Sequence, residues 1–351
     1  MYIEEFKEGM NKGLRKTLKI GLPLLLGTFI LYWVYHDFDF ARAGEVLSRD
    51  MHWGWMLLSL FFGVLGHVVR GWRWRQTLAP LGAYPKISDC VDAIFISYAA
   101  NLVLPRVGEL SRCGVLDRYD GVSFTQSLGT VVTERLIDTL CILLISGATF
   151  LLQMPVFFRF FEETGTKIPS FFHLLTSPWF YVTLFCVLGV LLLFYYLFRM
   201  LSFFDKVKGA ALNIWEGVMS LRNVKNLPLF LFYTLLIWLS YFLHFYLTFY
   251  CFSFTASLDL LAGLVLFVGG TFAVIVPTPN GAGPWHFAVI TMMMMYGVTA
   301  ADAGVFALIV HGIQTLLVVL LGMWGWLHLA FSRKKTAKKY QKTGSHFPGS
   351  E

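Results

Sequence analysis

The chain has 351 residues, of which 57% are apolar and 14% are charged, and its formal net charge is +7. Soluble domains carry roughly a quarter charged residues, so this composition excludes a soluble enzyme, a disordered chain and a disulfide scaffold. A mean hydropathy of +0.64 predicts an all-α polytopic membrane protein. The 34 phenylalanines and 11 tryptophans supply the aromatic side chains that gather at lipid interfaces.

Basic residues gather at the two ends of the chain. Residues 1–17 are expected to form a cytoplasmic or interfacial segment, and residues 332–351 a basic cytoplasmic tail. Short basic flanks beside apolar spans mark the cytoplasmic side of a membrane, which places both termini there and requires an even number of crossings. Binding of the tail to anionic lipid is an alternative role, whereas a nucleic-acid partner is not expected.

The five cysteines form no C-x-x-C pair and mostly lie in apolar runs. The sequence therefore predicts neither a metal site nor a disulfide framework, and no cofactor is expected.

The first two apolar runs are long enough to cross a membrane. The first, Leu18 to Tyr35, is longer than a signal-peptide core and ends in aromatic residues, which favours a spanning helix. The second, Met51 to Val69, is followed by Arg70, Arg73 and Trp74. Basic residues interleaved with tryptophans at a helix end predict an interfacial anchor, and direct contact with lipid phosphate is the alternative.

The next segment cannot span as one helix. Residues 92–104 are apolar but short and end at Pro105, and residues 106–118 are too polar. Non-helical backbone at membrane depth is tolerated only against protein or a wet cavity. These two pieces therefore predict a re-entrant hairpin entered from the cytoplasmic side. A third crossing over residues 123–150 follows, and Ser123 and Gln126 form an S-x-x-Q capping box at its start.

The second half repeats this organisation. Crossings are expected at residues 179–198 and 227–252, with an amphipathic surface helix at 204–221 between them. The apolar run 258–276 then meets a proline- and glycine-rich loop, resumes over 285–296, and predicts a second re-entrant hairpin, entered from outside. A final helix, 299–331, begins at a cap-like Thr299 with Asp302. The fold expected is therefore about six transmembrane helices plus two re-entrant hairpins.

The two interrupted segments resemble each other, with inverted halves at about 51–153 and 227–331. Residues 101–105 parallel residues 273–277, and residues 121–123 parallel residues 297–299. The same alignment places Arg135 on His311 and Asp138 on Gln314. Paired interrupted segments of opposite orientation are typical of alternating-access transporters. A purely structural repeat is the alternative.

Polar side chains concentrate around these interruptions. The candidate headgroup or cavity residues are Asn101, Arg106, Glu109, Arg112, Glu134, Arg135, Asp138, His311 and Gln314. The candidate re-entrant loop residues are Pro105, Gly108, Pro277, Pro279, Asn280, Gly281, Gly283 and His286. An ionised side chain costs on the order of 2.5–3.5 kcal/mol at a membrane helix centre, so the six charged residues, formally neutral as a set, must face a cavity or pair with one another. Both readings stay open at this point.

Four strings together resemble the lysylphosphatidylglycerol synthase transmembrane, or flippase-like, family over about residues 15–332. They are Arg70 with Trp72-Arg73-Trp74, then Asn101-x-x-x-Pro105-x-x-Gly108-Glu109-x-x-Arg112, then Glu134-Arg135-x-x-Asp138, then the late loop. The resemblance implies a flippase-like domain, residues 18–331, that moves a lipid between leaflets. The best-known members carry a fused soluble synthase domain, and no such domain is expected in this chain. Asn280 and His286 stand where the family pattern has glycine and glutamate.

The function expected is a lipid flippase of a bacterial-type cytoplasmic (inner) membrane, carrying a phospholipid or another phosphate-bearing lipid. Arg106, Arg112 and Arg135 would contact the phosphate. The neighbouring carboxylates would orient these arginines, bind an amine or carry a proton. One rival is a membrane-embedded lipid-modifying enzyme with Glu109, Glu134 or His286 as acid or base, although no nucleophile, nucleotide or metal motif supports it. Another is a non-transporting partner of a separate lipid-synthesis enzyme.

Overall fold

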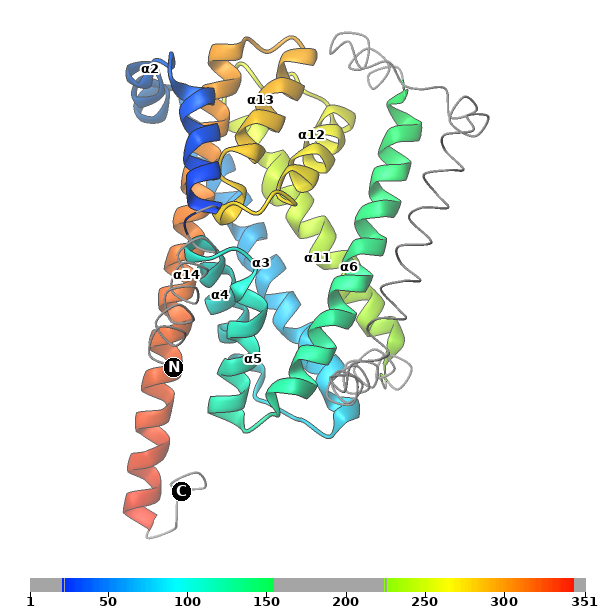
Figure 1. The fold of residues 1–351 in the computed structure, drawn as a ribbon, viewed down its shortest axis with the longest axis vertical. Coiled ribbons are helices and arrows are strands. Elements are labelled where there is room, and N and C mark those ends of the chain that lie inside the picture. The colour runs from blue at the N-terminus through cyan, green and yellow to red at the C-terminus, as the bar shows by residue number, and fades with distance from the viewer. Residues whose placement is uncertain (1–20, 22, 155–223, 225, 344–351) are drawn as a thin grey trace, which may run out of the picture.

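The computed structural model describes residues 21, 23–154, 224 and 226–343, and in this part of the chain the regular secondary structure is all helical, with ten α-helices and no strand. After an apolar helix at Pro23–Tyr35, the elements are α2 (Phe40–Glu45), η1 (Val46–Asp50), α3 (Trp53–Leu78), η2 (Ala79–Leu81), α4 (Ile87–Val103), α5 (Val107–Asp120), α6 (Phe124–Leu152), α11 (Leu227–Tyr246), η4 (Leu247–Cys251), α12 (Leu260–Ala273), η5 (Pro279–Gly281), α13 (Pro284–Met295) and α14 (Ala300–Thr343) (Figure 1).

Four helices are long and apolar enough to cross a membrane: Trp53–Leu81, Phe124–Leu152, Leu227–Cys251 and Ala300–Ser332. They confirm the helices predicted at 51–69, 123–150, 227–252 and 299–331. Of the first predicted crossing, the structure describes the helix Pro23–Tyr35. The predictions at residues 1–17, 179–198 and 204–221 lie outside the described residues.

The first interrupted segment is a helical hairpin of α4 and α5. Its turn contains Arg106, whose φ of +64° is in the left-handed region, which L-residues with a Cβ rarely adopt. The Asn101 side-chain oxygen accepts the Gly108 backbone N–H at 2.8 Å. A Cβ at Gly108 would lie 2.2 Å from the Ser97 carbonyl oxygen, so only glycine lets α5 approach α4 this closely. The N-x-x-x-P-x-x-G string therefore builds the hairpin itself.

The second interrupted segment is also a helical hairpin, formed by α12 and α13 with η5 between them. Asn280 and Gly281 have positive φ values of +51° and +73°, and Pro284 opens α13 at a position where its missing N–H costs nothing. The η5 turn packs against α4. The tip of the second hairpin therefore rests on the first hairpin near the middle of the molecule (Figure 1).

Each hairpin passes into its long helix through the same kind of turn. Gly121 and Gly297 both adopt left-handed conformations, with φ of +65° and +84°. The following valine N–H then reaches back to a carbonyl of the preceding helix at 3.2 Å in both places, Val122 to Leu116 and Val298 to Met293. The bond from Val298 spans five residues, as in a Schellman motif, and the bond from Val122 spans six, so the first is a wider glycine C-cap. Both turns occupy the positions that the sequence alignment paired.

The two long helices that follow these turns begin in different ways. Thr299 donates its hydroxyl to the Asp302 carboxylate at 2.7 Å and accepts the Asp302 N–H at 3.2 Å, which confirms the predicted cap. Ser123 occupies the N-cap position but its side chain makes no capping hydrogen bond, so the predicted capping box with Gln126 is wrong. Both side chains are exposed, and solvent competes for such bonds.

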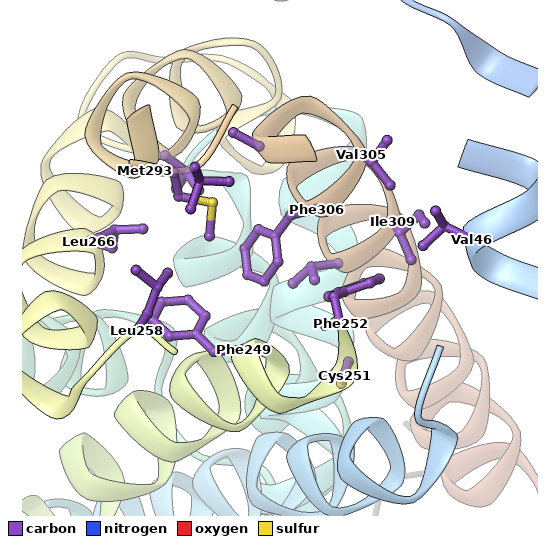
Figure 2. Close-up of a cluster of buried hydrophobic side chains, with 14 of the residues drawn as sticks. Val46, Phe249, Cys251, Phe252, Leu258, Leu266, Met293, Val305, Phe306 and Ile309 are labelled. Carbon is purple, nitrogen blue, oxygen red and sulfur yellow. The ribbon is translucent and has the colours of Figure 1, made fainter. Parts of the chain in front are cut away.

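Two hydrophobic cores lie within the described part of the bundle. One lies among α3, α4, α5 and α6 around Trp74, Ile94 and Leu116. The other joins α2, η1 and the start of α3 to η4, α12, α13 and α14, where Phe306 sits 5.5 Å from Phe249 between ring centroids. Figure 2 shows this second core, with Phe249, Leu266, Met293 and Phe306 gathered between η4, α12, α13 and α14, and Val46 beside Ile309 at one side. Each interrupted hairpin contacts both long helices, with α5 against α6 and α4 against α14, and with α13 against α14 and α12 against α6.

Candidate functional site

A cluster of charged side chains lies where α3, α5 and α6 meet. The six members are Arg70 and Arg73 from α3, Arg112 from α5, and Glu134, Arg135 and Asp138 from α6; we call them the arginine cluster. Its two carboxylates are one helical turn apart on α6, so they share the face that receives the arginines.

Glu134 joins α5 to α3. Its carboxylate lies 2.8 Å from Arg112 Nη1 and 3.5 Å from Arg73 Nε, and its side chain is fully buried. The Arg112 guanidinium also lies over the Trp74 ring, 4.7 Å from the centroid, an arrangement in which the ring quadrupole stabilises the cation. The Trp74 indole N–H donates to Thr130 at 3.0 Å, which fixes the ring.

Asp138 holds the other arginines. Its carboxylate accepts a hydrogen bond from Arg73 Nη2 at 2.8 Å and forms an ion pair with Arg70. Arg135, three residues earlier on α6, lies 3.1 Å from the same carboxylate, as expected for residues that share a helix face. Charge-assisted pairs of this kind are the strong ones in proteins.

The arginine cluster is not neutral. Four arginines face two carboxylates, which leaves an excess of two positive charges. Nε and Nη2 of the buried Arg112 have no hydrogen-bond partner among the described residues. Arg135 is 43% exposed, whereas Arg73 and Glu134 are fully buried. Unpaired N–H groups of a buried guanidinium are costly, so the cluster combines unmatched donors with an excess of positive charge.

The predicted interfacial anchor at Arg70, Arg73 and Trp74 is wrong. Arg70 is 3% exposed and the other two are fully buried, so they cannot contact headgroups at a helix end. The physical reason is that α3 continues past the predicted end at Val69 as far as Leu78. The three side chains therefore lie along a packed helix.

The structure also changes which charged residues lie together, compared with the six that the sequence predicted as a formally neutral group. Arg106 is exposed at the hairpin turn and Glu109 is half-buried, and neither forms an ion pair within the described part of the chain. Two arginines of α3 take their place. The signal that could have found them is their spacing, because Arg70 and Arg73 are three residues apart and so project from one helix face.

A group of aromatic side chains next to the arginine cluster was not predicted from the sequence. Arg70 Nη1 donates to the hydroxyls of Tyr98 at 3.2 Å and Tyr241 at 3.1 Å, and these hydroxyls are 2.8 Å apart. The His67 ring lies 4.1 Å from the Tyr98 ring between centroids. This group extends the polar interior from the arginine cluster along α3 between α4 and α11.

The residues predicted around the late loop form a second polar group. His311 Nε2 lies 3.1 Å from the Asn280 carbonyl oxygen, and the Asn280 amide donates to the Thr315 hydroxyl at 2.9 Å. His286 stands beside His311, with 4.5 Å between ring centroids. Gln314 is directed elsewhere and donates to the His244 carbonyl oxygen at 3.1 Å.

The remaining candidate residues shape the backbone. Asn101, Pro105 and Gly108 form the first hairpin turn, as described above. Pro277 is exposed and Pro279 begins η5. Gly283 has a φ of +93°, and a Cβ there would lie 2.9 Å from Ile30 Cβ, so it permits close contact with the first helix. The described residues contain no metal-binding group of three or more histidine, cysteine or acidic side chains.

Comparison with known proteins gives one family and one curated relative. Residues 20–322 match the family described as the lysylphosphatidylglycerol synthase TM region. A protein named glycosyltransferase AglD, from Haloferax volcanii, is 29% identical over 136 residues, which cover 38% of this chain and 21% of that protein. The chain thus spans about a fifth of the length of that relative. No solved structure matches.

Proposed function

Since the chain belongs to the family of lysylphosphatidylglycerol synthase TM regions, we propose that this integral membrane protein moves a phosphate-bearing lipid, a phospholipid in the simplest case, between the leaflets of a bacterial-type cytoplasmic membrane. It acts as a transporter and not as an enzyme. Its partner is the lipid, supplied by a separate lipid-synthesis enzyme, and both termini lie in the cytoplasm.

The observation that carries this proposal is the excess positive charge of the arginine cluster. Buried charge in a membrane protein is expensive and marks a functional pathway by default. The excess of positive charge attracts the negative charge of a lipid phosphate, and the planar guanidinium fork of Arg112 suits the phosphate oxygens. Arg135, half-exposed on α6, is placed to meet the headgroup first, while the acyl chains stay in the bilayer.

The arrangement of the helices supports alternating access. We propose that α4–α5 and α12–α13 are re-entrant hairpins that enter the bilayer from opposite faces, and that residues 51–153 and 227–331 form an inverted repeat. The left-handed glycines at Gly121 and Gly297, the crossed contacts of α4 with α14 and of α12 with α6, and the contact of η5 with α4 support it. In inverted-repeat transporters the substrate site lies where the repeats meet.

The rival proposal of a lipid-modifying enzyme has one point in its favour, since the Haloferax volcanii relative is named a glycosyltransferase. The match covers 21% of that protein, so most of that protein lies outside the shared segment. Glu134 is fully enclosed by two arginines, which is unsuitable for a general acid or base that must exchange protons with a substrate.

The test is lipid translocation in reconstituted vesicles. Purified protein would be reconstituted with fluorescent phosphatidylglycerol or with an uncharged fluorescent diacylglycerol glycoside. The movement of each lipid between leaflets would be scored by back-extraction with albumin. We expect movement of the phosphate lipid only. Arg112→Gln should reduce its rate at least tenfold, while Arg118→Gln, an exposed arginine on the same helix, should leave it unchanged.

Three results would refute the proposal. The first is absence of translocation by a folded protein, the second is equal movement of both lipids, and the third is a new lipid product in place of translocation. Thermal melting of both variants shows whether a loss of rate reflects unfolding.

A further inference from the structure

In the polar group around the late loop, both ring nitrogens of His311 have hydrogen-bond partners when this ring is neutral. His311 Nε2 faces the Asn280 carbonyl oxygen at 3.1 Å, and a carbonyl can only accept, so Nε2 carries the hydrogen. His311 Nδ1 then accepts from the Thr315 hydroxyl at 3.5 Å, and that hydroxyl accepts the Asn280 amide at 2.9 Å. We call Asn280, His286, His311 and Thr315 the histidine site.

His286 is held in the neutral form in a similar way. Its Nδ1 accepts the Gly283 backbone N–H at 3.4 Å, which places the ring hydrogen on Nε2. The ring is 3% exposed. It lies between His311, at 4.5 Å, and the edge of Tyr35, at 5.6 Å between centroids.

The elements packed around the histidine site supply no charge to either ring. The first helix contributes Tyr35, and α13 contributes Trp285, whose ring lies 5.2 Å from His311. On the α11 side, the Gln314 amide donates a hydrogen bond to the backbone carbonyl oxygen of His244. Within the described residues no ion pair reaches either ring from α4, α11, α12 or the first helix. A proton added here would therefore create a cation without a counter-ion.

The site can accept that proton without rebuilding. A proton on His311 Nδ1 would turn this atom into a donor toward the Thr315 hydroxyl. Thr315 has two lone pairs, so it can accept from His311 and from the Asn280 amide together when its own hydrogen rotates away. The result is a cationic pocket beside η5, and η5 packs against α4 of the hairpin that carries Arg112.

We propose that the histidine site is a second phosphate subsite, which binds the lipid phosphate only when a proton has been taken up. This inference rests on the proposed function and deepens it. In the alignment of the halves His311 stands where Arg135 stands in the first half, so one subsite is permanently cationic and the other is titratable. The phosphate moves between them, the proton enters from water on the α12–α13 side as the phosphate arrives, and it returns there when the lipid leaves.

The experiment measures the pH dependence of phosphatidylglycerol translocation in vesicles with equal pH on both sides, from pH 8 to pH 6. We expect the wild-type translocation rate to rise about tenfold for each unit by which the pH falls, as long as the histidine site is mainly neutral. This slope is required when one proton must bind. His311→Gln, whose amide can still donate to the Asn280 carbonyl, should give a flat and lower profile, and so should His286→Gln. His36→Gln, at a half-exposed histidine outside the site, should keep the wild-type slope.

The outcomes separate the two proposals. Wild-type translocation without pH dependence, or an unchanged slope in both histidine variants, would overturn the histidine site and leave the transporter intact. No translocation at any pH would refute the proposed function together with the inference. Uptake of inorganic [³²P]phosphate with this pH dependence, in place of lipid movement, would overturn the lipid assignment.

Discussion

The sharpest structural test of the arginine cluster is the replacement Glu134→Gln. Glu134 is fully buried and touches two guanidinium groups, Arg112 at 2.8 Å and Arg73 at 3.5 Å. At an effective dielectric constant of about 20, these contacts correspond to attractions of about 6 and about 5 kcal/mol before desolvation is counted. Glutamine keeps the shape but removes the charge, which raises the excess in the cluster from two positive charges to three.

Because desolvation of the carboxylate offsets part of that attraction, the net loss is smaller than the gross sum. Removing one partner of a buried ion pair costs about 3–5 kcal/mol, and we expect this loss in the free energy of unfolding. The measurement is reversible unfolding of the purified protein in mixed micelles, followed by tryptophan fluorescence. Glu109→Gln is the matched control. Glu109 lies on the neighbouring helix and forms no ion pair within the part of the chain that the structure describes, so the change should alter stability by less than about 0.5 kcal/mol.

An equal loss in both variants would refute the assignment of Glu134 as the central anion of the cluster. A loss below about 1 kcal/mol for Glu134→Gln would do the same, because it would mean that solvent already screens the pair, as at the protein surface.

Hydropathy predicted the long helices well, since a lipid-embedded backbone must satisfy its hydrogen bonds internally and apolar runs of about 20 residues have few alternatives. Proline and glycine also located both hairpins. Pro105 and Gly108, and the proline-rich stretch before Pro284, stop a helix for local steric reasons. The glycine turns at Gly121 and Gly297 were visible for the same reason.

Only part of the site could be predicted from the sequence, because ion pairs form between residues that are distant in sequence. Arg112, Glu134 and Asp138 were recognised as charges in apolar surroundings, but their partners Arg70 and Arg73 lie on α3, more than 60 residues before Asp138. The tryptophans beside those arginines suggested a helix end. The local pattern of an interfacial anchor and that of a buried cation stacked on a ring are alike, and tertiary packing decides between them.

Two further predictions concern the frame around the site. Gly108→Ala should lower the free energy of unfolding by about 1–3 kcal/mol, because its Cβ would lie 2.2 Å from a backbone oxygen of α4. Gly114→Ala on the same helix meets nothing within 4 Å and should raise it by up to about 1 kcal/mol. Thr299→Ala should cost about 1 kcal/mol, since its hydroxyl caps α14. Ser123→Ala should cost less than about 0.5 kcal/mol, because that hydroxyl caps nothing in α6. Equal losses for the two cap variants in the same unfolding assay would mean that the hydroxyl hydrogen bonds are not what starts the long helices.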